Sequence, residues 1–143
     1  MKSPAEHVRT SYQGTYYQRT LKIKSKKHLE VTQLQTIKWA DLTAPDDTKI
    51  LRDLVHQAMD INTNKDPILV HCSAGVGRTG TFIGVYKLVE DFMNNRPLDF
   101  QETVQDMRRC RTRMVQKKQQ YHYIYKCVRD DIKSEDGEYY YSL

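Results

Sequence analysis

Hydrophobic and polar side chains alternate in the first third of the chain, and this alternation predicts two β-strands. Residues 17–24 show a period of two, which is typical of a strand with two different faces. After a Ser-Lys-Lys turn, a second strand is predicted over residues 29–39. The positions of one parity in it are Leu29, Val31, Ile37 and Trp39. Residues 1–14 are polar without such a pattern, and we expect them to be loose.

Further along, the apolar positions recur at the spacing of helices. A loop at residues 44–47 leads into a first helix, whose apolar positions are Leu51, Leu54, Val55, Ala58 and Ile61. A second helix is marked by Phe82, Tyr86, Val89 and Met93, and a third by Phe100, Val104, Met107 and Cys110 or Arg111. A fourth is predicted from Lys117 to Ile132, and we expect residues 134–143 to be a loose end.

A short unbroken apolar run at residues 67–71 separates the first and second helices. Such a run is typical of a buried strand. The resulting order β-β-α-β-α-α-α predicts the α/β class, with a mixed β-sheet flanked by helices. A chain of 143 residues has the size of one domain, so residues 1–143 are expected to form a single unit.

Composition narrows the possible classes of protein. With 38% hydrophobic and 29% charged residues, the chain is expected to be globular rather than disordered. The longest apolar run is too short for a membrane span, and the amino terminus lacks the apolar segment of a secretory signal. Three widely spaced cysteines form no disulfide framework, which favours a reducing compartment such as the cytoplasm. The net charge of +5 is compatible with anionic ligands.

The segment from His71 to Gly80 carries the clearest chemistry. A cysteine follows the predicted buried strand, then come five small residues, an arginine and a helix. Gly75 and Gly77 allow the backbone to curl, so that successive N–H groups face inward and the next helix points its positive end at the same place. Arg78 can hold two phosphate oxygens in its planar fork. Together these features predict a phosphate-binding loop, called here the phosphate cradle.

The same positive groups act on the sulfur of Cys72. Helix N-termini and cations lower the pKa of a thiol, so Cys72 is expected to be a thiolate at neutral pH, beneath a bound phosphate. Its attack on phosphorus would give a phosphocysteine, and Thr79 could hydrogen-bond the sulfur when it leaves. A small buried cysteine at the end of a strand is the usual alternative, and an anion-binding turn without chemistry is another. Neither explains why cysteine, two glycines and arginine occur together.

The string HCSAGVGRTGTF, residues 71–82, resembles the signature of the protein-tyrosine phosphatases. It is similar to the phosphotyrosine-specific branch of that family, and implies a phosphatase-like fold with a truncated amino-terminal part. The resemblance implies that Cys72 is the nucleophile and that His71 tunes the loop and the thiolate. It further implies a phosphate site formed by Ser73, Ala74, Gly75, Val76, Gly77 and Arg78.

The family also carries a general acid on a Trp-Pro-Asp loop. Here Trp39, Ala40 and Asp41 stand at the corresponding place, so the resemblance implies that Asp41 protonates the leaving tyrosyl oxygen and later accepts a proton from water. Trp39 would be the hinge that packs the loop. Alanine in place of proline should loosen the open loop and slow the enzyme or alter its closing.

The segment after Arg113 resembles the family's VQ…QY stretch. It implies that Gln116 positions water against the phosphocysteine, with Gln120 as a secondary polar candidate. A basic cluster lies nearby and is expected to be a solvated face, or else to steer acidic phosphopeptides. Its members are Arg108, Arg109, Arg111, Arg113, Lys117 and Lys118.

The resemblance covers residues 15–132 but only the carboxyl-terminal part of a full phosphatase domain, and the tyrosine-recognition loop has no counterpart here. We expect a hydrolase that dephosphorylates phosphotyrosyl proteins in cytoplasmic signalling, with no metal, cofactor, membrane segment or nucleic-acid partner. The sequence does not indicate an oligomeric state. A phosphotyrosine-binding decoy with little turnover, or a dual-specificity phosphatase, remains open as an alternative.

Overall fold

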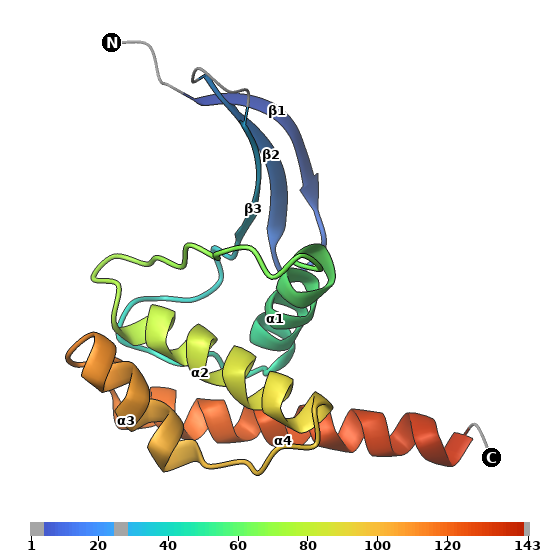
Figure 1. Ribbon diagram of the computed structural model, residues 1–143, viewed down its shortest axis with the longest axis vertical. Coiled ribbons are helices and arrows are strands. Elements are labelled where there is room, and N and C mark those ends of the chain that lie inside the picture. Colours follow the sequence, from blue (N-terminus) through green and yellow to red (C-terminus); the bar gives the residue numbers. More distant parts are fainter. Residues whose placement is uncertain (1–4, 25–28, 142–143) are drawn as a thin grey trace.

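The computed structural model describes residues 5–24 and 29–141, with side chains over residues 9–24 and 29–134. Three strands come first, β1 (Ala5–Tyr12), β2 (Tyr17–Ile23) and β3 (Leu29–Gln35), and four helices follow. The helices are α1 (Lys49–Ile61), α2 (Gly77–Met93), α3 (Phe100–Cys110) and α4 (Lys118–Tyr141). The sheet stands away from the helices and meets them near α1 (Figure 1).

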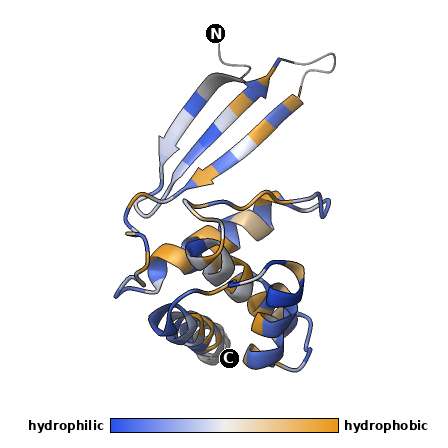
Figure 2. Ribbon diagram, turned by 90° about the vertical axis from the view of Figure 1, so that its left-hand side faces the viewer, coloured by the Kyte–Doolittle hydropathy of each residue, from blue (hydrophilic) through white to orange (hydrophobic). Residues whose placement is uncertain are grey.

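The strands form one antiparallel sheet in the order β1-β2-β3, with Leu21 opposite Val31 and Tyr17 opposite Gln35. The expectation that residues 1–14 are loose is wrong for residues 5–12, which pair with β2. Most side chains of β2 and β3 are only half-buried or exposed, and apolar and polar residues alternate along them (Figure 2). A strand held mainly by its backbone pairing needs no apolar pattern of its own, which is why the polar β1 was missed.

The α/β class is confirmed, but every strand pair in the described residues is antiparallel, so the sheet is not mixed. The strand predicted over residues 67–71 is absent: this segment is irregular, and Leu69 is 90% exposed. An apolar run indicates only a tendency toward burial. A strand forms only where the backbone of a neighbouring strand can pair with it through hydrogen bonds. The second strand also ends at Gln35 instead of residue 39, which leaves Trp39 in the connection to α1.

The helices surround a hydrophobic core centred on α2, which packs against α1, α3 and α4. Its fully buried residues include Leu51, Val55, Val85, Leu88 and Ile124. Helix α3 begins where the Asp99 side chain accepts a hydrogen bond from the Glu102 amide over 2.8 Å. Helix α4 continues to Tyr141, so the loose end predicted from residue 134 is wrong as far as residue 141. No helix in the described residues is both long and apolar enough to cross a membrane.

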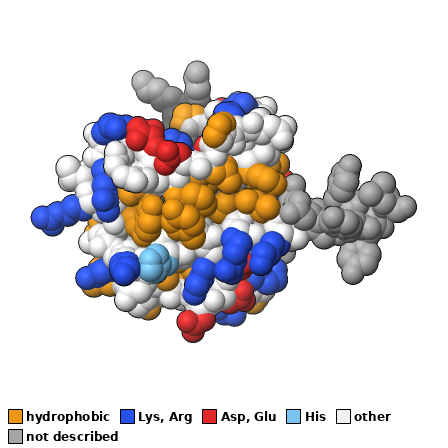
Figure 3. Space-filling model, turned by 90° about the horizontal axis from the view of Figure 1, so that it is seen from below, with side chains coloured by type: hydrophobic (Ala, Val, Ile, Leu, Met, Phe, Trp, Pro, Cys, Tyr) orange, Lys and Arg blue, Asp and Glu red, His pale blue; other side chains and the backbone are white. Residues whose placement is uncertain are grey.

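Side-chain contacts connect the sheet to α1 and connect helices to one another. At the base of the sheet, Thr15 donates to Asp53 over 2.7 Å and Tyr16 donates to Gln57 over 3.0 Å, so the sheet is anchored to α1. On the underside, an apolar band lies between groups of Lys and Arg (Figure 3). Between two of the helices, the Phe100 ring of α3 stacks on Tyr125 of α4 at 3.8 Å between centroids.

Candidate active site

The loop of residues 72–78, called here the cysteine loop, curls around the sulfur of Cys72. Gly75 adopts a left-handed conformation (φ +68°), which glycine accepts without strain. This turn directs the Gly75 amide to the sulfur over 3.2 Å, and the Thr79 hydroxyl donates to it over 3.1 Å. Helix α2 begins at Gly77, so its free amide groups lie beside the same sulfur.

These contacts change the acidity of the thiol. Burial of the sulfur raises the pKa of Cys72, but donors outweigh it and bring the pKa down to about 7. The donors are the Thr79 hydroxyl and the backbone amides of Thr79, Gly75 and Val76. Hydrogen bonds that favour the charged form lower a pKa in this way. A substantial fraction of Cys72 is therefore a thiolate near neutral pH.

Arg78, in the first turn of α2, reaches across the loop to the segment of residues 39–43, called here the acid segment. Its Nη1 donates to the Trp39 carbonyl and its Nη2 to the Ser73 hydroxyl, each over 2.9 Å. Its Nη2 also lies 3.3 Å from Oδ1 of Asp41. The Nε of Arg78 is buried and has no acceptor among the described residues.

Asp41 lies beside Ser73 of the cysteine loop, and its side chain is half exposed. Its Oδ2 accepts from the Ser73 hydroxyl over 2.9 Å, and its Oδ1 accepts from the Leu42 amide over 3.0 Å. The Ser73 hydrogen bond is the main reason that the pKa of Asp41 is lowered, with further help from Leu42 and Arg78. These contacts therefore favour the carboxylate form of Asp41.

The acid segment is held by its ends. Trp39 is buried, its ring lies edge-on to Tyr123 at 5.7 Å, and its Nε1 donates to the Thr43 carbonyl over 2.8 Å. The Thr43 hydroxyl donates in turn to the Ala40 carbonyl over 2.7 Å. Asp41 is thereby carried on a short turn that is fixed to the core by the tryptophan.

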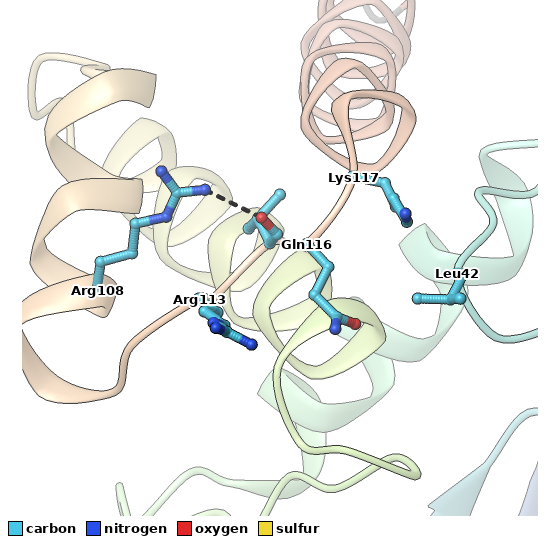
Figure 4. Close-up of a pocket in the computed structure, with 6 residues that line it drawn as sticks. Leu42, Arg108, Arg113, Gln116 and Lys117 are labelled. Atoms are coloured by element: carbon cyan, nitrogen blue, oxygen red, sulfur yellow. Dashed lines mark hydrogen bonds between the residues drawn. The ribbon is translucent and has the colours of Figure 1, made fainter.

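Gln116 and Gln120 lie beside Gly77, at the start of α2. Gln120 is fully buried, and its Oε1 accepts from the amides of Gln116 and Lys117 over 3.0 and 3.1 Å. These two hydrogen bonds fix the start of α4, and Nε2 of Gln120 donates to the Thr43 carbonyl over 3.4 Å. Gln116 reaches the cysteine loop: a Cβ added to Gly77 would lie 2.7 Å from Gln116 Oε1. The side chain lines a cavity of about 460 Å³ with Arg108, Arg113 and Lys117 (Figure 4).

Two arginines of the basic cluster brace the site, a role that their sequence pattern did not indicate. Arg111 donates to the Ala74 carbonyl over 3.2 Å, and its guanidinium covers Gly75. Arg108 donates to the Met114 carbonyl over 2.9 Å and to the Val115 carbonyl over 3.0 Å, the dashed line in Figure 4. The Val115 amide then donates to the Val76 carbonyl over 2.9 Å, which joins the segment before α4 to the cysteine loop. The clustering of arginines in the last turn of α3 and just after it was the only signal available in the sequence.

His71 differs from the other candidates. Its side chain is exposed and makes no hydrogen bond or ion pair with the described residues. The structure therefore brings Cys72, Ser73, Arg78, Thr79, Asp41 and Gln116 together, but it gives His71 no contact with the sulfur. Over the described residues, no group of three or more His, Cys, Asp or Glu side chains is arranged to hold a metal ion.

Comparison with known proteins shows to which family the chain belongs. The family described as protein-tyrosine phosphatase matches residues 5–130. The chain belongs to the protein-tyrosine phosphatase family. The match runs from the sheet through the cysteine loop into α4, so this fold positions the candidate site within a family domain.

Individual relatives are similar over about three-quarters of this phosphatase-family chain. The receptor-type tyrosine-protein phosphatase eta of Gallus gallus is 42% identical over 108 residues, which is 73% of this chain and 8% of the relative. The protein-tyrosine-phosphatase PTP1 of Arabidopsis thaliana is 32% identical over 107 residues, 73% of this chain and 32% of the relative. The chain thus spans a third or less of the length of these relatives.

Proposed function

We propose that this chain hydrolyses phosphotyrosine in proteins through a phosphocysteine intermediate. The observation that carries the proposal is the Cys72 sulfur, whose pKa is lowered to about 7 inside a loop that also holds Arg78. A thiolate is a nucleophile, and an arginine with inward-facing amides binds the phosphoryl oxygens on which negative charge develops. Membership of the protein-tyrosine phosphatase family supports the substrate class.

In the first step, the Cys72 sulfur attacks phosphorus, and the bond between phosphorus and the tyrosyl oxygen breaks. Asp41 gives its proton to that oxygen, and tyrosine leaves as a neutral phenol. Arg78 turns its guanidinium to the phosphoryl group, and the Nε that has no acceptor among the described residues is available for it. The amides of the cysteine loop hold the remaining phosphoryl oxygens.

In the second step, water attacks the phosphocysteine and the phosphorus–sulfur bond breaks. Gln116, which lies beside Gly77, is placed to orient that water. Asp41, now a carboxylate, takes the proton, and inorganic phosphate is released. Thr79 donates to the departing sulfur as it does in the free chain, and thereby stabilises the thiolate.

A phosphate-release assay tests the proposal. We expect the wild-type chain to release phosphate from a phosphotyrosyl peptide, with inhibition by vanadate, and Cys72→Ser to be inert. Acid quenching during turnover of a radiolabelled peptide should trap label on the wild-type chain and none on the Cys72 variant. A thermal melt of both proteins separates an inactive chain from an unfolded one. A folded wild type that is as inert as Cys72→Ser would refute the proposal.

One observation favours a second function, which is phosphotyrosine binding with little turnover. Asp41 is a carboxylate paired with Arg78 in the free chain, whereas the first step needs a protonated acid. Peptide binding by wild type without phosphate release would support this binding function. A phosphoserine peptide in the same assay addresses dual specificity, and we expect it to be a much poorer substrate.

The cellular setting is part of the proposal. Cys72, Cys110 and Cys127 are all free thiols, which fits a reducing compartment such as the cytoplasm and a role in phosphotyrosine signalling. We further propose that residues 1–143 act as one partial phosphatase domain. The hydrogen bonds from Thr15 and Tyr16 to α1 support this, because they join the sheet to the helices that carry the site.

A further inference from the structure

We propose that Ser73 is a positioning residue for the acid, holding Asp41 in place while Arg78 exchanges its carboxylate for the phosphoryl group. This inference rests on the proposed function. It concerns the hydroxyl of Ser73, which is distinct from the backbone of that residue in the phosphate cradle.

The three side chains form a closed ring in the free chain. Arg78 Nη2 donates to the Ser73 hydroxyl over 2.9 Å, and that hydroxyl donates to Asp41 Oδ2 over 2.9 Å. The ring closes through the ion pair of Arg78 with Asp41 Oδ1 at 3.3 Å. Ser73 is thus the only one of the three that both accepts and donates, and its single proton is directed to the carboxylate.

A phosphoryl group and the Asp41 carboxylate compete for the same guanidinium. Both are anions, and Arg78 cannot direct Nη2 fully at both. When a dianionic phosphoryl group takes the guanidinium, Asp41 loses its cationic partner and gains a negative neighbour. Like charge disfavours a carboxylate, so this exchange moves Asp41 toward the protonated form that the first step needs.

The exchange also removes the ion pair that holds Asp41 toward the loop. The turn of the acid segment fixes the backbone, but the carboxyl group then keeps only the Leu42 amide and the Ser73 hydroxyl. Of these two, Ser73 alone belongs to the cysteine loop and links the acid to the reacting group. A short polar side chain at this position therefore sets the distance between the acid and the leaving oxygen, on which proton transfer depends.

Two substrates with different leaving groups distinguish a positioning role of Ser73 from a purely structural one. Tyrosine is a poor leaving group and needs the acid, whereas p-nitrophenolate leaves without it. We expect Ser73→Ala to lower kcat on a phosphotyrosyl peptide about tenfold and kcat on p-nitrophenyl phosphate by less than about twofold. Ser73→Thr keeps the hydroxyl and should restore most of the peptide activity. In an Asp41→Asn background, Ser73→Ala should have no further effect on the peptide.

Each possible result either supports or overturns the role proposed for Ser73. Equal losses on both substrates would show that Ser73 only supports the loop, and unchanged activity on both would show that it has no role; either overturns the inference while the proposed function stands. A folded wild type that is inactive on both substrates would refute the proposed function and this inference with it. Because retained turnover of p-nitrophenyl phosphate requires a folded loop, that substrate also reports whether Ser73→Ala has unfolded.

Discussion

The hydroxyl of Thr79 donates a hydrogen bond to the sulfur of Cys72 over 3.1 Å, from the first turn of α2. It is the leading contribution among the donors that keep the pKa of Cys72 near 7 against burial. We expect Thr79→Ala to raise this pKa by roughly one unit, and Thr79→Ser, which keeps the hydroxyl, to change it little. The measurement is the rate of alkylation by iodoacetamide as a function of pH.

The other two thiols, Cys110 and Cys127, must not contribute to the measured rate of alkylation. Cys110 is exposed, so the experiment is made in a Cys110→Ser background. Cys127 is buried, which raises its pKa to about 12 and keeps it protonated and unreactive. If the alkylation midpoint of Thr79→Ala coincides with that of wild type, the backbone amides alone stabilise the thiolate.

Gly80 allows α2 to approach the segment that carries Gln116. A Cβ on this residue would lie 2.6 Å from the amide nitrogen of Val115, which donates to the Val76 carbonyl. We expect Gly80→Ala to separate the two segments, with a loss of about 2 kcal/mol in the free energy of unfolding. Urea denaturation measures this loss.

Gly84→Ala, one turn further along α2, is the matched control. Its Cβ would meet the flexible ends of Ile124 and Met107 at 3.0 and 3.4 Å instead of backbone, so the loss should be smaller. Equal losses in the two variants would contradict the role assigned to the contact between Gly80 and Val115.

The sequence predicted features that depend on local pattern. The four helices follow from apolar spacing, and the cysteine loop follows from the close succession of Cys72, Gly75 and Arg78. The features that it missed depend on distant neighbours. Strand β1 exists because β2 offers it a partner, and the predicted strand at residues 67–71 is absent because no neighbouring strand pairs with it in the described residues.

The candidate site shows the same division. The residue types proposed here for the chemistry follow from the sequence, whereas their partners in space do not. Ser73 was predicted as part of the cradle, but its hydroxyl also joins Asp41 to Arg78, two residues 37 positions apart. Arg111 was assigned to a basic cluster, yet it contacts the Ala74 carbonyl and covers Gly75. Such contacts depend on how α3 and the acid segment fold back toward the loop.

Ala40 provides a test of how the acid segment moves. Its carbonyl accepts from Thr43, while its amide donates to no acceptor among the described residues, so proline there removes no hydrogen bond. Proline restricts the backbone of the open segment and reduces the entropy lost on closing. We expect Ala40→Pro to raise kcat on a phosphotyrosyl peptide about twofold. A lower kcat with an unchanged thermal melt would show that the segment needs its present freedom.

The carboxylate of Asp131 on α4 is buried between two residues of α1. Its Oδ1 accepts from Arg52 Nε over 2.8 Å, and His56 Nε2 lies 2.8 Å from the same oxygen. Burial raises the pKa of Asp131, but the hydrogen bonds from His56 and Arg52 lower it further than burial raises it. The same contact raises the pKa of His56 above its ordinary value. Removal of the charge in Asp131→Asn should cost about 3 kcal/mol in the free energy of unfolding.

The pKa shifts of His56 and Asp131 make the free energy of unfolding depend on pH in opposite directions. The pKa of His56 is raised in the folded chain, so its contribution is complete below the ordinary value of about 6.5 and is lost as the pH rises through the raised pKa. The pKa of Asp131 is lowered, so its contribution is complete above about 3.9 and is lost as the pH falls through the lowered pKa. We therefore expect His56→Gln to destabilise the chain more at pH about 5.5 than at about 8.5. Asp131→Asn should destabilise it at both values, because Arg52 stays charged. Urea denaturation of the two variants and wild type at both pH values measures these differences. A loss of stability in His56→Gln that is the same at both pH values would contradict the prediction. It would show that the imidazole stabilises the contact between α1 and α4 only as a neutral group.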